Sequence, residues 1–154
     1  MRSNAPSCSA WRLYVIIDRA AAGCRPLAEI ADAAIRGGAD VLQLRDKTAS
    51  AETLLAEAKT LLHLTRAAGI PLIINDRPDI AYASGADGVH LGQDDLPVAA
   101  ARRLLGPERL IGKSTHSLGQ ARAAEAEGPD YIGVGPIFST PTKPDYEPVG
   151  LRLI

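Results

Sequence analysis

Short apolar runs alternate with longer amphipathic stretches along this chain. The runs that predict buried β-strands cover residues 13–17, 41–44, 71–74, 88–91, a run that opens at 110–111, and 131–134. The stretches between them that predict helices cover residues 26–37, 52–68 and, roughly, 79–83, 97–105 and 118–127. Each helix returns the chain to the same end of the sheet. Six strands with five intervening helices therefore predict parallel pairing.

A short motif recurs where a predicted helix ends and a strand begins. It covers residues 38–41, 85–88 and 128–131, at intervals of 47 and 43 residues, which is about two βα units each. A repeated βα unit favours an α/β fold of the (β/α) TIM-barrel kind, and no G-x-G-x-x-G follows the first strand. A full barrel needs eight such units. We therefore expect an incomplete TIM barrel with about six, either as a fragment or with its open edges covered, for instance in a homo-oligomer that closes the barrel.

Composition and charge narrow the function classes. We expect residues 1–12 to form a flexible leader without a packing role or the apolar centre of a secretion signal, and residues 13–154 to form one domain. The balance of 17 basic and 18 acidic residues argues against a broad nucleic-acid surface, and no long apolar run predicts a membrane span. The spacing of Cys8 and Cys24 matches no metal motif, which is typical of reduced thiols in a cytoplasmic protein.

Polar residues collect directly after the predicted strands. In a parallel barrel these strand ends share one face, and that face carries the active site. The residues that collect in this way are Gln43, Arg45, Asp46 and Lys47, then Asn75, Asp76 and Arg77, then His90, Gln93, Asp94 and Asp95, then Lys113, Ser114, Thr115 and His116, and finally residues 139–143.

Two cations follow the second strand on one side of an extended segment. Arg45 offers a bidentate fork and Lys47 a point charge, and this combination suits a phosphate or diphosphate. A surface salt bridge of these two residues with Asp46 is the alternative.

Two carboxylates end neighbouring strands close to these cations. Asp76 and Asp95 facing a diphosphate site would suit Mg²⁺, which takes its remaining oxygens from water and substrate. The alternative is helix capping, because Asp76 precedes Pro78 and Asp95 precedes Pro97. His116 is a candidate proton donor or a hydrogen-bonded structural residue, and His90 on its apolar strand is interpreted as part of the core or as a support for the site.

Four ordered motifs resemble those of the thiamine-phosphate synthase family. They are QLRDK (43–47), IINDRPDIAYASGADGVHLGQDDLP (73–97), IGKSTHS (111–117) and YIGVGPIFSTPTK (131–143), and the similarity extends from about residue 13 to the C-terminus. The resemblance implies a TIM barrel that joins a hydroxymethylpyrimidine diphosphate to a thiazole phosphate, uses Mg²⁺ and releases diphosphate. Both substrates are small molecules, and no protein nucleophile is required.

The resemblance also implies roles for individual residues. Asp76 and Asp95 match the two Mg²⁺ ligands. Residues that match contacts to the pyrimidine diphosphate, or lie within its motif, are Gln43, Leu44, Arg45, Asp46, Lys47, Asn75, Ser114 and Lys143. Residues that match the loop for the thiazole phosphate are Thr140, Pro141 and Thr142.

Two other functions compete with this interpretation. A related thiazole tautomerase would use a histidine, here His116, and would need neither diphosphate cations nor Mg²⁺. An inactive barrel fragment is the second alternative, because the glycine-rich loops after strands seven and eight, which complete the thiazole phosphate site in the family, do not occur in these 154 residues. On this hypothesis the diphosphate half of the site is kept and affinity for the thiazole phosphate is lost.

Overall fold

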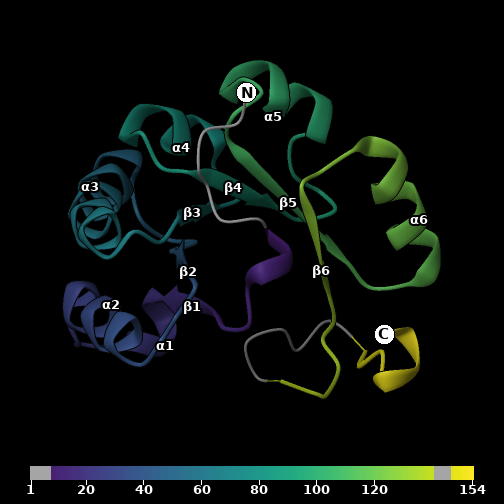
Figure 1. Ribbon diagram of the computed structural model, residues 1–154, viewed down its shortest axis with the longest axis horizontal. Coiled ribbons are helices and arrows are strands. Elements are labelled where there is room, and N and C mark those ends of the chain that lie inside the picture. The colour runs from purple at the N-terminus through teal and green to yellow at the C-terminus, as the bar shows by residue number, and fades with distance from the viewer. Residues whose placement is uncertain (1–7, 141–146) are drawn as a thin grey trace.

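The computed structural model describes residues 8–140 and 147–154, and its centre is one curled parallel sheet (Figure 1). The sheet pairs its strands in chain order, each parallel to the next, which confirms the predicted pairing. The strands are β1 (Tyr14–Asp18), β2 (Val41–Arg45), β3 (Leu72–Asn75), β4 (Gly88–Leu91), β5 (Leu110–Thr115) and β6 (Tyr131–Val134). The sheet curls into a half-barrel.

Helices cover the outer face of this half-barrel, as Figure 1 shows. They are α1 (Arg19–Ala22), α2 (Leu27–Arg36), α3 (Ala51–Ala68), α4 (Pro78–Ser84), α5 (Val98–Leu105) and α6 (Leu118–Glu127), with short 3-10 turns at Cys8–Ala10 and Leu151–Leu153. The five predicted helices are confirmed, while the single turn of α1 was not predicted. Within the described residues, no helix has the length and apolar character needed to cross a membrane.

Local sequence signals define the longest helix, α3. Ser50 precedes it, and its hydroxyl accepts a hydrogen bond from the backbone N–H of Thr53 at 3.1 Å. Gly69 ends it in the left-handed conformation, with φ of 70°, which glycine adopts without a steric penalty. Its leucines at helical spacing turn inward, and Leu54 and Leu61 are buried. Capping residues and one apolar face thus fix this helix against the sheet.

The alternation of side chains along the strands separates two layers of core. Leu42 and Ile74 point outward into the large cluster between the sheet and the helices. Val41 and Ile73 point inward and form a smaller cluster on the concave side. Gln43, Asn75 and Ser114 share this concave side, so the packing of the outer layer decides which residues can reach a ligand.

The segment before β1 packs against the small inner cluster. The ring of Trp11 lies 5.9 Å from that of Tyr14 and 5.2 Å from that of Tyr131, in edge-to-face contacts. Cys8 packs against the same cluster. The expectation that residues up to 12 lack a packing role is therefore wrong for this part, because an aromatic side chain fills the base of the half-barrel.

The recurring motif of the sequence has a structural explanation in its aspartates. One carboxylate oxygen of Asp40 accepts a hydrogen bond from the backbone N–H of Leu13 at 2.8 Å. Asp87 does the same for Leu72 at 2.9 Å, and Asp130 for Ile111 at 2.8 Å. Each of these aspartate clamps, Asp40, Asp87 and Asp130, lies just before one strand and holds the start of the preceding strand. They therefore align the sheet two strands at a time.

Gly112→Ala tests the close packing on the concave side. A Cβ atom at Gly112 would lie 2.2 Å from a ring carbon of Tyr131 and 2.5 Å from Nδ1 of His90. We expect this substitution to lower the free energy of unfolding in urea by about 1–3 kcal/mol through overpacking. Gly119→Ala in α6 is the control, because the nearest atom would be 3.8 Å away. Equal effects of the two substitutions would contradict the close approach.

Candidate functional site

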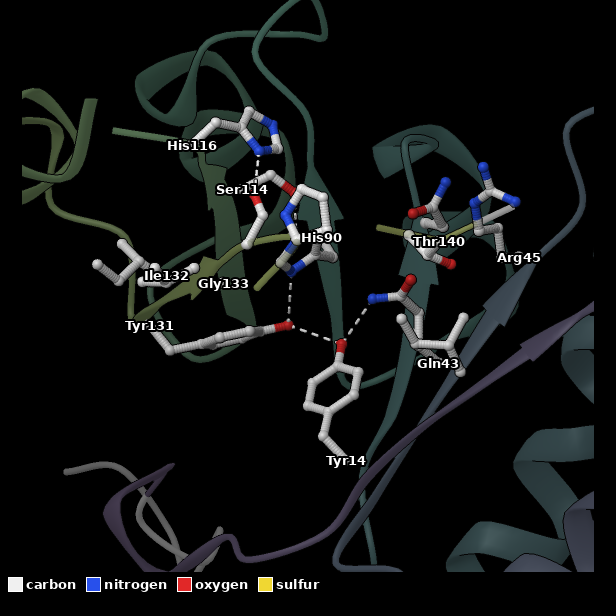
Figure 2. A pocket seen from close by; sticks show the side chains of 15 residues that line it. Tyr14, Gln43, Arg45, His90, Ser114, His116, Tyr131, Ile132, Gly133 and Thr140 are labelled. Carbon is white, nitrogen blue, oxygen red and sulfur yellow. Dashed lines mark hydrogen bonds between the residues drawn. The ribbon is translucent and has the colours of Figure 1, made fainter. Parts of the chain in front are cut away.

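One cavity of about 470 Å³ opens on the concave side of the half-barrel, a volume suited to a small organic ligand. All six strands or the segments after them contribute to its wall (Figure 2). The polar side chains that line it are Tyr14, Gln43, Arg45, Asn75, His90, Ser114, His116, Tyr131 and Thr140.

Five of the ten predicted site residues that the structure describes line this cavity. Gln43, Arg45, Asn75 and Ser114 line it, and Thr140 reaches it from the segment after β6. The predictions for Pro141, Thr142 and Lys143 fall outside the described residues. The convergence that the sequence predicted for the strand ends is therefore present in the structure.

Three residues of the QLRDK motif, Leu44, Asp46 and Lys47, do not line the cavity. Leu44 is 0% exposed and lies in the apolar layer between the sheet and the helices, so its side chain does not reach the cavity, and its contact with a substrate stays a prediction. The alternation of the strand sends its side chain away from the cavity that Gln43 and Arg45 face. The carboxylate of Asp46 accepts hydrogen bonds from the backbone N–H groups of Thr48 and Ala49, at 2.9 and 3.0 Å, and so fixes its own loop.

An ion pair across β1 and β2 holds the first predicted cation. The guanidinium of Arg45 contacts the carboxylate of Asp18, its partner in the strand register. Asp18 also begins α1 by accepting a hydrogen bond from the N–H of Ala20 at 2.8 Å. Arg45 therefore pairs with Asp18 rather than Asp46. The sequence analysis missed Asp18, although a carboxylate at the end of the first strand was a usable signal.

The two predicted metal ligands lie next to each other. The carboxyl groups of Asp76 and Asp95 lie close enough for the charge of Asp95 to act on Asp76, and Lys47 Nζ lies 3.7 Å from Asp76 Oδ2. Burial, together with the neighbouring Asp95, raises the pKa of Asp76 to about 6. Asp76 has a φ of 61°, a left-handed conformation that is uncommon outside glycine.

The alternative of helix capping is wrong for both carboxylates. The N-cap residues of α4 and α5 are Arg77 and Pro97, and neither helix has a side-chain cap. Asp95 instead accepts a hydrogen bond from the N–H of Gly92 at 2.6 Å, which orients it within its own loop.

The pair of carboxylates fits one kind of metal ion. Within residues 8–140 and 147–154, no three His, Cys, Asp or Glu side chains gather into a complete ligand set. Mg²⁺ is commonly held by one or two carboxylates, and it completes its octahedron with water and phosphate oxygens. Repulsion between Asp76 and Asp95 would be relieved by a divalent cation, so these two residues fit a magnesium ion that shares its coordination with a substrate.

A series of hydrogen-bonded side chains lines the cavity (Figure 2). Gln43 Nε2 donates to the Tyr14 hydroxyl at 2.7 Å, and that hydroxyl lies 2.9 Å from the hydroxyl of Tyr131. Tyr131 lies 3.2 Å from His90 Nδ1, and His90 Nε2 lies 2.9 Å from Ser114 Oγ. The sequence analysis missed both tyrosines, because each is the first residue of an otherwise apolar strand.

Burial keeps the two tyrosines protonated. It raises the pKa of Tyr14 to about 12, and it also raises the pKa of Tyr131 well above its ordinary value. His90 therefore faces a hydroxyl rather than a phenolate. His116, the candidate proton donor, contacts the carbonyl oxygen of Gly135 through Nδ1. The cavity thus combines hydroxyl, amide and imidazole groups with one guanidinium, that of Arg45.

Comparison with known proteins agrees with this description. Residues 13–154 match the family model of thiamine monophosphate synthase. The thiamine-phosphate synthase of Roseiflexus castenholzii is 53% identical over 90% of this chain and 61% of its own length, and that of Chloroflexus aurantiacus is 54% identical over 92% and 65%. The chain thus spans a little under two thirds of these relatives.

Solved structures give the same result for the fold. The thiamine phosphate pyrophosphorylase from Pyrococcus furiosus superposes with a TM-score of 0.83 at 37% identity, over 93% of this chain and 67% of that one. A 3-dehydroquinate dehydratase from Geobacillus kaustophilus superposes with a TM-score of 0.64 at 19% identity over 80% of this chain and 61% of that one, and it shares the fold alone.

Asp76→Asn tests whether the carboxylate pair reduces stability. With a pKa of about 6 in the folded protein against an ordinary 3.8, Asp76 contributes stability that is complete below about pH 4 and is lost as the pH rises through 6. Asparagine tolerates the left-handed backbone and removes the charge. In EDTA at pH 7.5 we expect the free energy of unfolding of the variant to be about 1 kcal/mol higher than that of the wild type, after allowance for solvent screening. This difference should disappear as the pH falls toward 4.

Asp79→Asn is the matched control for this measurement. A hydrogen bond from Arg77 lowers the pKa of Asp79, so loss of its charge should give no gain at pH 7.5. A wild type more stable than Asp76→Asn at pH 7.5 would contradict the repulsion between Asp76 and Asp95.

Proposed function

The chain belongs to the thiamine monophosphate synthase family, and we propose that it condenses a hydroxymethylpyrimidine diphosphate with a thiazole phosphate to give thiamine phosphate and diphosphate. It is then a transferase with small-molecule substrates and no nucleic-acid or membrane partner, in keeping with its formal charge of −1. A cytoplasmic location is part of the proposal.

One observation carries the proposal: Asp76 lies beside both Asp95 and Lys47, and it directly follows Asn75, which lines the cavity together with Arg45. Lys47 lies against Asp76, while Arg45 is held by Asp18 and lines the cavity. A diphosphate bound there would meet positive charge from both side chains, and its metal ion would be held by Asp76 and Asp95. Mg²⁺, when bound, would neutralise charge on the departing diphosphate.

The protein residues would act by binding and orientation. The bond that breaks joins the pyrimidine methylene carbon to the diphosphate oxygen, and the bond that forms joins that carbon to the thiazole nitrogen. Arg45 and Lys47 stabilise the leaving group as its charge develops. Gln43, Asn75 and Ser114 would hold the pyrimidine ring in the cavity, where its electron-rich amino-substituted ring can support the carbon cation. No step uses a protein nucleophile.

We also propose that the half-barrel is an incomplete TIM barrel, with about six of eight βα units in residues 13–154. The parallel strand order and the concave site at the carboxyl ends of the strands support this assignment. Thr140 is the part of the expected thiazole phosphate loop that the structure describes, and it lines the cavity. Gln43, Arg45, Asn75 and Ser114, the residues proposed for the pyrimidine diphosphate, line the same cavity.

Thiamine phosphate formation by the 154-residue chain, measured with both substrates in Mg²⁺ and in EDTA, tests the function. We expect product only with Mg²⁺. The double variant Asp76→Asn, Asp95→Asn should lower turnover by more than about 100-fold, because even outer residues of metal sites contribute about 10- to 100-fold. Asp79→Asn serves as the control and should retain turnover.

The alternatives give different results in the same assay. A thiazole tautomerase that uses His116 would act without Mg²⁺ and without the pyrimidine substrate. A folded chain that binds the pyrimidine diphosphate with Mg²⁺ but forms no product would be a binding fragment. Turnover that persists in the double variant with unchanged Mg²⁺ dependence would contradict the metal assignment.

A further inference from the structure

Five side chains form a continuous hydrogen-bonded chain of four links across the concave side. The order is Gln43, Tyr14, Tyr131, His90 and Ser114, with heavy-atom distances of 2.7, 2.9, 3.2 and 2.9 Å. Tyr14 and Tyr131 begin β1 and β6, while Ser114 lies near the carboxyl end of β5. The five-residue chain therefore crosses the concave side, and all five of its residues line the cavity (Figure 2).

The first link fixes the direction of the hydrogen bonds. The amide nitrogen of Gln43 has only protons to offer, so the Tyr14 hydroxyl accepts. Tyr14 has one proton of its own, and in the part of the chain that the structure describes the Tyr131 hydroxyl is its one hydrogen-bond acceptor. A buried hydroxyl proton without an acceptor would cost about 1–3 kcal/mol. Tyr14 therefore donates to Tyr131.

The remaining links follow from proton counting. Tyr131 has accepted from Tyr14, so it donates its own proton to His90 Nδ1. His90 is then the tautomer that carries its proton on Nε2, and this N–H donates to Ser114 Oγ. The hydroxyl proton of Ser114 is left to point into the cavity that this residue lines. The opposite direction would instead make His90 a base for Ser114, as in a serine nucleophile.

We propose that the five-residue chain makes Ser114 a fixed hydrogen-bond donor, so that the cavity selects a ring with a lone pair at that position. The inference rests on the proposed function, in which the ring is an aminopyrimidine. A ring nitrogen would accept a hydrogen bond from the Ser114 hydroxyl. A ring C–H at that position would leave this hydroxyl without an acceptor, and an amino group would place two hydrogen-bond donors against each other. Tyr14, Tyr131 and His90 are positioning residues that act through Ser114.

The tautomer of His90 tests the direction without any substrate. We expect nitrogen NMR of the full chain, labelled with ¹⁵N-histidine, to show His90 protonated on Nε2, with its signals assigned by their loss in His90→Gln. Tyr131→Phe should convert this single form into a mixture, because Nδ1 loses its donor. Tyr82→Phe removes an exposed hydroxyl on α4 and is the matched control, which should leave the tautomer unchanged. A wild-type His90 protonated on Nδ1 would overturn the proposal.

Ligand selection is tested by the affinity for the pyrimidine diphosphate with Mg²⁺, compared with the two pyridine analogues in which one ring nitrogen is replaced by C–H. We expect the wild type to bind one analogue about tenfold more weakly, the value of about one hydrogen bond. Ser114→Ala should bind the substrate and that analogue equally. Tyr131→Phe should reduce the discrimination, and the double variant should be no worse than Ser114→Ala, because both changes act on one contact.

Several results would contradict the selection. Additive effects of Ser114→Ala and Tyr131→Phe would show that the tyrosine has an independent structural role, and thermal unfolding of each variant separates this from loss of the fold. Equal affinity of the wild type for the substrate and both analogues would also overturn it. A wild type that binds no pyrimidine compound would contradict the proposed function and the selection together, while the His90 tautomer in the free protein would still decide the direction of the chain.

Discussion

Parallel pairing of the strands in chain order is the constraint on which the rest of this molecule depends. It places all six carboxyl ends at one edge of the sheet, so residues far apart in sequence, such as Arg45 and Ser114, line a single cavity. The two-residue period of a strand then decides which side chains face the cavity. Gln43 and Arg45 face it, and Leu44 between them is buried under the helices. The packing of alternate side chains under the helices therefore determines which polar side chains face the cavity.

Much of the fold could be predicted because its signals are local. Apolar periodicity, the cap at Ser50 and the glycine at position 69 specify α3 from its own sequence. Strand β5 was harder to delimit, because Gly112–Thr115 lacks an apolar pattern and is strand because it pairs on both sides. The packing of Trp11 could not be predicted either, since its contact with Tyr131 joins opposite ends of the chain. Such contacts exist only once the sheet has curled.

Some features of the candidate site could likewise be predicted from the sequence, and others could not. The residues that converge at the cavity were predictable from strand ends and from motifs of the family. The role of Asp18 was not, because it depends on the register that places it beside Arg45. The left-handed backbone at Asp76, which lies beside Asp95, is likewise not specified by its sequence neighbours. Both features hold charges in positions that a stable fold alone would not require, and this is common at functional sites.

The aspartate clamps at the base of the sheet have a mechanical consequence. They join β1 to β2, β3 to β4 and β5 to β6 by side chain as well as by backbone, whereas the boundaries between these pairs lack the carboxylate link among the described residues. The half-barrel therefore consists of three strand pairs, each joined by an aspartate side chain. When the sheet opens transiently, we therefore expect a pair of strands to separate from the rest, rather than a single strand. The aspartate links lie at the amino ends of the strands, opposite the cavity. Residues at the carboxyl ends can therefore be substituted while the strand pairs stay joined.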